Sequence, residues 1–191
     1  MPVTTLDAIA APIVIDLQKG IVARQTVHPA IEIVDRSAQL ARAFRERGLP
    51  VVLVNVIGAA PGRTDSVRPK FSPSADWAEF APELRQHPSD HIVSKQRIGA
   101  FIGTDLDEYL RQRGVTQVFL TGIATTAGVE STARSAYDYG YNVVFVVDAM
   151  TDRDADTHRH AIEKTFPRFG ETETTENVLK QLKNAKKTIE A

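Results

Sequence analysis

The sequence predicts an α/β fold with three layers, α/β/α, around a doubly wound, mainly parallel sheet of five to six strands. Two observations lead to this prediction. Short, nearly continuous apolar runs alternate with longer stretches of helical periodicity, and this alternation is typical of parallel sheets covered by helices on both faces. At 191 residues the chain also suits one domain, which we expect to span 1–191 with its core at about 11–180.

Five segments are predicted to be strands because they are rich in β-branched and aliphatic residues and lack the alternation of a half-exposed strand. In chain order these segments are 12–16, 51–57, 91–95, 117–122 and 142–148. Ligands of such sheets bind outside the carboxyl ends of the strands. We therefore expect the functional site at that edge.

Five helices are predicted from apolar spacing and from residues that begin or end helices. They are 30–47, a helix that opens with a capping-box pattern at Thr104 and ends at Gly114, 129–139, 154–166, and 175 to about 187. Glycines follow the first three helices, as expected of C-caps. Residues from about 183 to 191 are expected to form a basic C-terminal tail.

The segment 58–90 has no regular pattern and is rich in proline. A long irregular loop in a compact domain is usually functional or disordered. Because this one contains Phe71, Trp77 and Phe80, we expect a packed loop that covers a site.

The composition excludes several classes of function. The formal net charge is -1, so the chain lacks the basic surface of a nucleic-acid-binding protein. It has no cysteine, which excludes disulfides, Cys/His zinc clusters and a thiol nucleophile. The N-terminal segment does not resemble a secretion signal, and no apolar run approaches the ~20 residues of a membrane span. We expect a cytoplasmic protein without nucleic-acid or membrane partners.

Two charged residues and one turn are predicted to meet at the carboxyl edge of the sheet. Asp16 ends the first strand, Lys95 ends the strand 91–95, and the turn before Gly128 follows the strand 117–122. A carboxylate beside an ammonium has its charged form stabilised, whereas burial acts in the opposite direction, so the pair suits acid or base catalysis near neutral pH. The spacing leaves open a purely structural ion pair or helix cap.

These positions also carry a resemblance to a known family. The segments that carry it are Asp16 to Gln18, 95–106 (KQRIGAFIGTDL), 121–134 (TGIATTAGVESTAR) and 141–149. Together they resemble the isochorismatase-like hydrolase superfamily, from about residue 11 to 179. The resemblance implies a Rossmann-like topology, a small-molecule substrate and a homo-oligomer, either a dimer or a tetramer.

Most members of that superfamily, such as nicotinamidases and carbamoylsarcosine hydrolases, use an Asp, a Lys and a nucleophilic Cys. The matching positions here are Asp16, Lys95 and Gly128. Because glycine offers no nucleophile, the thiolate chemistry of the family is excluded. Isochorismatases proper keep the acid and the lysine without the thiol. The resemblance to them implies that Asp16 protonates a vinyl ether, while Lys95 orients Asp16 or stabilises charge.

The resemblance therefore implies a hydrolase that acts without covalent thiol catalysis on a small polar or cyclic metabolite, with Asp16 as general acid or base. The alternative is a catalytically inactive family member that binds a metabolite or a protein partner. The residues with which isochorismatases hold the ring carboxylate have no clear match, and Arg63 and Arg68 are expected to be surface residues.

Further residues are expected to support the site. The candidate substrate-binding residues are Gln18, Trp77, Arg97, Phe101, Ala124 and Thr125. The family pattern implies a cis peptide bond at Ile123–Ala124, and we expect Thr126 to cap the following helix.

We expect neither a metal nor a cofactor. His158 and His160 lie two apart in a predicted helix and cannot share a face. His87 and His91 lack the carboxylate-rich spacing of a metal site, so they are expected at the surface. Asp148 is expected to accept hydrogen bonds from loop backbone.

Overall fold

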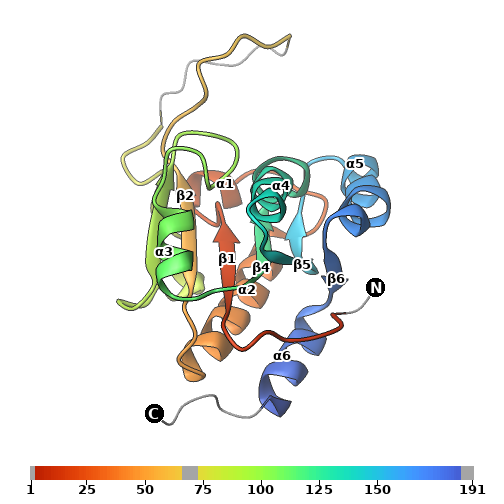
Figure 1. Ribbon diagram of the computed structural model, residues 1–191. Coiled ribbons are helices and arrows are strands. Elements are labelled where there is room, and N and C mark those ends of the chain that lie inside the picture. Colours follow the sequence, from red (N-terminus) through yellow and green to blue (C-terminus); the bar gives the residue numbers. More distant parts are fainter. Residues whose placement is uncertain (1–2, 66–72, 186–191) are drawn as a thin grey trace.

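The computed structural model describes residues 3–65 and 73–185 (Figure 1). Phe71 and Arg68, and the last residues of the predicted tail, 186–191, lie outside the described residues. No helix within the described ranges is long and apolar enough to cross a membrane.

A six-stranded, fully parallel sheet forms the middle layer, with the strand order β3-β2-β1-β4-β5-β6. The strands are β1 (Ala10–Ile15), β2 (Val52–Val56), β3 (His91–Lys95), β4 (Gln117–Ile123), β5 (Asn142–Thr151) and β6 (Glu171–Glu173). Five of them match the predicted segments closely. The sixth was not located in the sequence because it is a short polar strand at the edge of the sheet.

Helices cover both faces of the sheet, which confirms the three-layer fold. α2 (Ala30–Glu46) and α6 (Thr175–Asn184) contribute to the core on one face, and α3 (Leu106–Gln112) and α4 (Glu130–Asp138) to the core on the other. Alternate residues of β1 point into opposite cores: Val14 into the core under α2 and α6, and Ile13 and Ile15 into the core under α3 and α4. Both faces of β1 are therefore apolar, which explains its continuous apolar run.

Three of the five helix predictions need correction, and the predicted helix 129–139 is found as α4 with an additional turn before it. The predicted helix at Thr104 begins at Leu106, and its N-cap residue is Asp105; Thr104 Oγ1 donates to the Ala100 carbonyl and accepts from the Leu106 N–H at 3.4 Å. The predicted helix 154–166 is an α-helix only over α5 (Ala155–His160), continuing as a π-helical turn and a 3₁₀ turn that includes Pro167. A π-helical turn, η2 (Thr125–Val129), precedes α4. The last helix ends at Asn184 rather than near 187.

Two short helices were not predicted. They are α1 (Lys19–Val22), directly after β1, and the 3₁₀ helix η1 (Pro82–Leu84) in the irregular segment. Neither is long enough to show an apolar period.

The direction of strand order reverses between β1 and β4, which are neighbours in the sheet. Gly122 allows the close approach of these strands: its φ is +122°, and a Cβ there would collide with the Ile15 carbonyl oxygen. Loops from the two strands diverge at such a switch point and leave a crevice. The carboxyl ends of β1 and β4 thus define where a ligand is expected.

Candidate active site

A cavity of about 410 Å³ opens at the carboxyl edge of the sheet. Asp16, Lys95 and Gly128 all line it, so the three predicted positions do come together. Much of the remaining wall is apolar, with Ile21 and Ile123 among its side chains. This volume is in the range of small-molecule sites.

Asp16 is held in a rare backbone conformation. It directly follows β1 with φ of +56°, a left-handed conformation that non-glycine residues seldom adopt. Its N–H donates to the Val54 carbonyl at 2.8 Å, which continues the pairing of β1 with β2 and fixes this geometry. Strain of this kind concentrates at functional sites.

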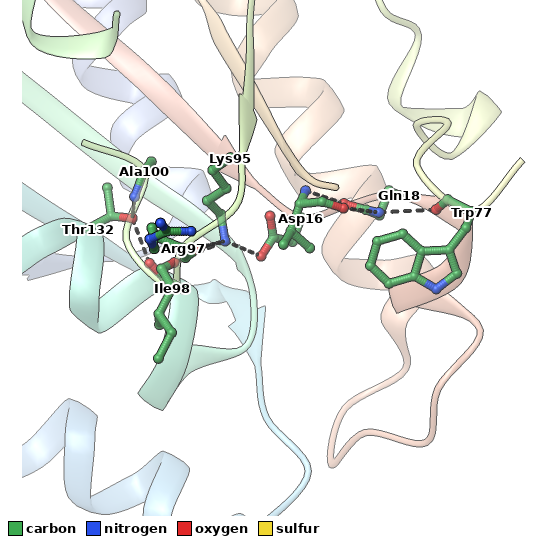
Figure 2. A network of polar contacts seen from close by, with 10 residues as sticks. Asp16, Gln18, Trp77, Lys95, Arg97, Ile98, Ala100 and Thr132 are labelled. Atoms are coloured by element: carbon green, nitrogen blue, oxygen red, sulfur yellow. Dashed lines mark hydrogen bonds and ion pairs between the residues drawn. The ribbon is translucent and has the colours of Figure 1, made fainter. Parts of the chain in front are cut away.

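Lys95 holds the carboxyl group of Asp16 in place (Figure 2). Its Nζ donates to Asp16 Oδ2 at 2.8 Å, to the Ile98 carbonyl at 2.9 Å and to the Arg97 carbonyl at 3.4 Å. The ammonium group therefore has an acceptor for each of its three hydrogens and ties the segment after β3 to Asp16. The other oxygen, Asp16 Oδ1, is buried and has no hydrogen-bond partner in the described part of the chain.

Burial raises the pKa of Asp16 to about 6, and the charge and hydrogen bond of Lys95 only partly oppose this effect. The carboxyl group is therefore partly protonated near neutral pH, which is the range that a general acid or base needs.

The raised pKa predicts a pH-dependent stability. Between about pH 4 and pH 6 the native state holds a proton on Asp16 that the unfolded state releases, so the free energy of unfolding falls as the pH rises through this window. Asp16→Asn lacks this titration. We expect the wild type to lose about 2 kcal/mol relative to this variant between pH 4 and pH 7 in urea unfolding.

The exposed Asp138 provides the control for this measurement. Asp138→Asn should leave the pH dependence of the free energy of unfolding as it is in the wild type. A constant difference between wild type and Asp16→Asn across the pH range would contradict the prediction.

Gly128 lies directly opposite the acid and the lysine. A Cβ on this residue would be 3.2 Å from Asp16 Oδ2 and 3.7 Å from Lys95 Nζ, but only 2.9 Å from Cγ2 of Ile15. Thr132 holds the turn in place, since its Oγ1 donates to the Gly128 carbonyl and accepts from the Ala100 N–H (Figure 2). A side chain at position 128 would thus project into the cavity beside both charged groups.

The turn before Gly128 contains a cis peptide bond, and Asp152 holds it through two hydrogen bonds. The Ile123–Ala124 bond is cis, as predicted. Asp152 Oδ2 accepts from the N–H and the hydroxyl of Thr126 at 2.8 and 2.7 Å, so the prediction that Thr126 caps the helix is wrong. Asp152 itself lines the cavity.

Two of the six predicted substrate-binding residues, Arg97 and Ala124, line the cavity. Gln18 does not: it is fully buried, and its amide bonds to both backbone groups of Val56 and to the Trp77 carbonyl (Figure 2). Trp77 packs on Gly20, where a Cβ would collide with the indole. These two side chains brace the wall of the cavity and do not form its surface.

Phe101 and Thr125 are also buried outside the cavity lining. Phe101 belongs to the core and lies beside Tyr139 and Tyr141. Thr125 Oγ1 forms a 2.8 Å hydrogen bond with Nδ1 of His158. His158 is therefore a buried structural residue.

Of the remaining predictions, the one for Asp148 is confirmed, because its Oδ1 accepts from the Thr175 N–H at the start of α6. His91 is not a surface residue: it stacks on Tyr109 with ring centroids 3.7 Å apart. Its Nε2 lies 3.1 Å from Asp105 Oδ2.

Sequence reasoning missed three charged residues that line the cavity: Arg24, Asp152 and Arg153. Asp152 and Arg153 follow β5, which continues past a bulge to Thr151, three residues beyond the predicted end. Correct placement of that strand end would have found both residues. Arg24 follows the unpredicted α1.

Comparisons with known proteins identify the relatives of this chain. Residues 10–177 match the family model described as the isochorismatase domain. An uncharacterized isochorismatase family protein of Bacillus subtilis, YwoC, is 40% identical over 91% of this chain and 94% of the relative. An isochorismatase of the same organism is 30% identical over 82% of this chain and 52% of the relative. The structure of an isochorismatase family protein from Burkholderia thailandensis has a TM-score of 0.91, with 41% identity over 94% of this chain and 98% of that chain.

Proposed function

The chain belongs to the isochorismatase family of hydrolases, and we propose that it hydrolyses a small polar or cyclic metabolite without forming a covalent enzyme intermediate. The observation that carries this proposal is the carboxyl group of Asp16. It is buried, it lines the cavity, it is paired through one oxygen with Lys95, and its other oxygen has no hydrogen-bond partner among the described residues.

Gly128 supports the proposal because the resemblance of the segment 121–134 matches it to the position of the family's nucleophilic cysteine. The chain has no cysteine, and no side chain at position 128 approaches the substrate. The space beside Asp16 Oδ2 and Lys95 Nζ is left for a water molecule or for part of the substrate.

A vinyl ether shows how such a site works. Asp16, in its protonated form, gives its proton to the methylene carbon of the substrate, and the resulting oxocarbenium ion takes up water. The adduct then breaks the carbon–oxygen bond to the ether group and releases an alcohol and a carbonyl compound, which is a keto acid where the vinyl carbon bears a carboxylate, and the excess proton returns to Asp16. Lys95 stabilises the carboxylate that exists between these proton transfers.

A catalytically inactive protein that binds a metabolite or a protein partner is the second candidate. The absence of a nucleophile at position 128 favours it. The strained, pKa-shifted Asp16 favours the hydrolase, because a binding site alone does not require an acid of this kind.

A substrate panel tests the proposal. Isochorismate, other vinyl ethers, amides and esters are incubated with the wild type and with Asp16→Asn, and the protein is quenched during turnover for intact mass spectrometry. We expect hydrolysis of at least one compound by the wild type, with no mass increase of the protein. A covalent adduct would contradict the proposed route, and equal rates for wild type and Asp16→Asn throughout the panel would favour the binding protein.

A further inference from the structure

The cavity is lined by more cationic than acidic side chains, and two of the cations have no acidic partner within the described ranges. Four cationic residues line it, namely Arg24, Lys95, Arg97 and Arg153, against two acids, Asp16 and Asp152. Lys95 is fully engaged by Asp16 and two carbonyls. Asp152 accepts from Thr126 and from the Arg153 backbone N–H. Neither acid forms an ion pair with an arginine within the ranges 3–65 and 73–185.

Arg24 and Arg153 stand out among these cations. Within the described ranges, neither guanidinium forms a hydrogen bond or an ion pair. Arg97, in contrast, donates to the neighbouring Gln96 carbonyl. Arg24 and Arg153 come from segments that follow different strands, β1 and β5, and both line the same cavity.

The two guanidinium groups are close enough to affect each other. Partial burial and, to a lesser extent, the positive charge of Arg153 lower the pKa of Arg24. Two like charges with no counterion between them are unfavourable, and an anion bound between them removes the repulsion.

Resting on the proposed function, we infer that Arg24 and Arg153 form a subsite for a carboxylate group of the substrate. A guanidinium binds a planar carboxylate through a bidentate fork. The nearby Asp16 and Asp152 oppose a doubly charged phosphate more strongly than a singly charged carboxylate. The substrate is then a small molecule with a carboxylate at the arginines and its reactive part at Asp16, against the apolar wall.

A matched pair of probes, benzoate and its neutral amide benzamide, tests this subsite by isothermal titration calorimetry. We expect the wild type to bind benzoate about tenfold or more tightly than benzamide. The double variant Arg24→Gln/Arg153→Gln should lose this preference. As a control, Arg42→Gln/Arg159→Gln removes the same charge from exposed arginines on α2 and α5 and should retain it.

Three results would overturn the subsite: no preference for benzoate in the wild type, a preference that survives in Arg24→Gln/Arg153→Gln, or inorganic phosphate bound as tightly as benzoate. Asp16→Asn separates this inference from the proposed function, because it removes the acid and keeps both arginines. Retention of the benzoate preference in Asp16→Asn supports the subsite. If that preference is found but no compound of the panel is hydrolysed, the subsite stands and the hydrolytic function fails.

Discussion

Asp16→Asn is expected to lower kcat/KM by about 10²- to 10⁴-fold, the usual contribution of a positioned general acid. The variant removes the titratable proton and changes little else. Asparagine tolerates the left-handed backbone that position 16 requires, and its amide oxygen can still accept from Lys95 Nζ. The measurement is steady-state hydrolysis of the substrate found in the panel, at pH 6.

The pH dependence of kcat/KM in the wild type tests whether Asp16 acts as an acid. Because the pKa of Asp16 is raised to about 6, a reaction that needs its protonated form should slow progressively above that pH. We expect kcat/KM to fall toward tenfold per pH unit at alkaline pH. A rate that instead rises through pH 6 to a plateau would show that Asp16 acts as a base.

The exposed Asp138 again supplies the matched control, since Asp138→Asn makes the same chemical change far from the cavity lining. Its kcat/KM should equal that of the wild type. If Asp16→Asn keeps more than a tenth of wild-type kcat/KM, Asp16 is not the general acid.

The sequence predicts the sheet well for a physical reason. Strands covered on both faces favour apolar residues on both sides, and the four inner strands, β1, β2, β4 and β5, therefore appear as largely apolar runs. β6 (Glu171–Glu173) has no such run, because it consists of only three polar residues. Helix ends were less predictable, since π and 3₁₀ turns follow tertiary contacts rather than apolar spacing.

The candidate site was predictable where it depends on strand ends. Asp16 and Lys95 are polar residues directly at the ends of apolar runs, and parallel strands bring such ends to one edge. The positions of Gln18 and Trp77 could not be predicted in this way. They depend on a contact between residues 59 apart in sequence, the hydrogen bond from the Gln18 amide to the Trp77 carbonyl. Arg24 and Arg153 lie in loops, where an arginine that lines a cavity is indistinguishable in sequence from one in solvent.

Gly128→Cys is expected to create amidase activity. A Cβ at position 128 lies 3.2 Å from Asp16 Oδ2 and 3.7 Å from Lys95 Nζ, so a thiol there is within reach of a carboxylate that can accept its proton and an ammonium that stabilises the thiolate. We expect hydrolysis of nicotinamide or a related amide, absent in the wild type, that iodoacetamide abolishes.

Steric crowding sets the limit of this experiment. The new Cβ would lie 2.9 Å from Cγ2 of Ile15, so the chain must shift, and overpacking of this kind typically costs about 1 to 3 kcal/mol. The φ of Gly128 is not in the left-handed region, so the backbone itself accepts a side chain. Gly128→Ala carries the same Cβ without the thiol and should show the same loss of stability with no amidase activity. The contrary outcome is a Gly128→Cys protein that folds and whose thiol reacts with iodoacetamide, but which hydrolyses no amide. This result would show that Asp16, Lys95 and position 128 do not form a cysteine-hydrolase site, and it would favour the binding protein.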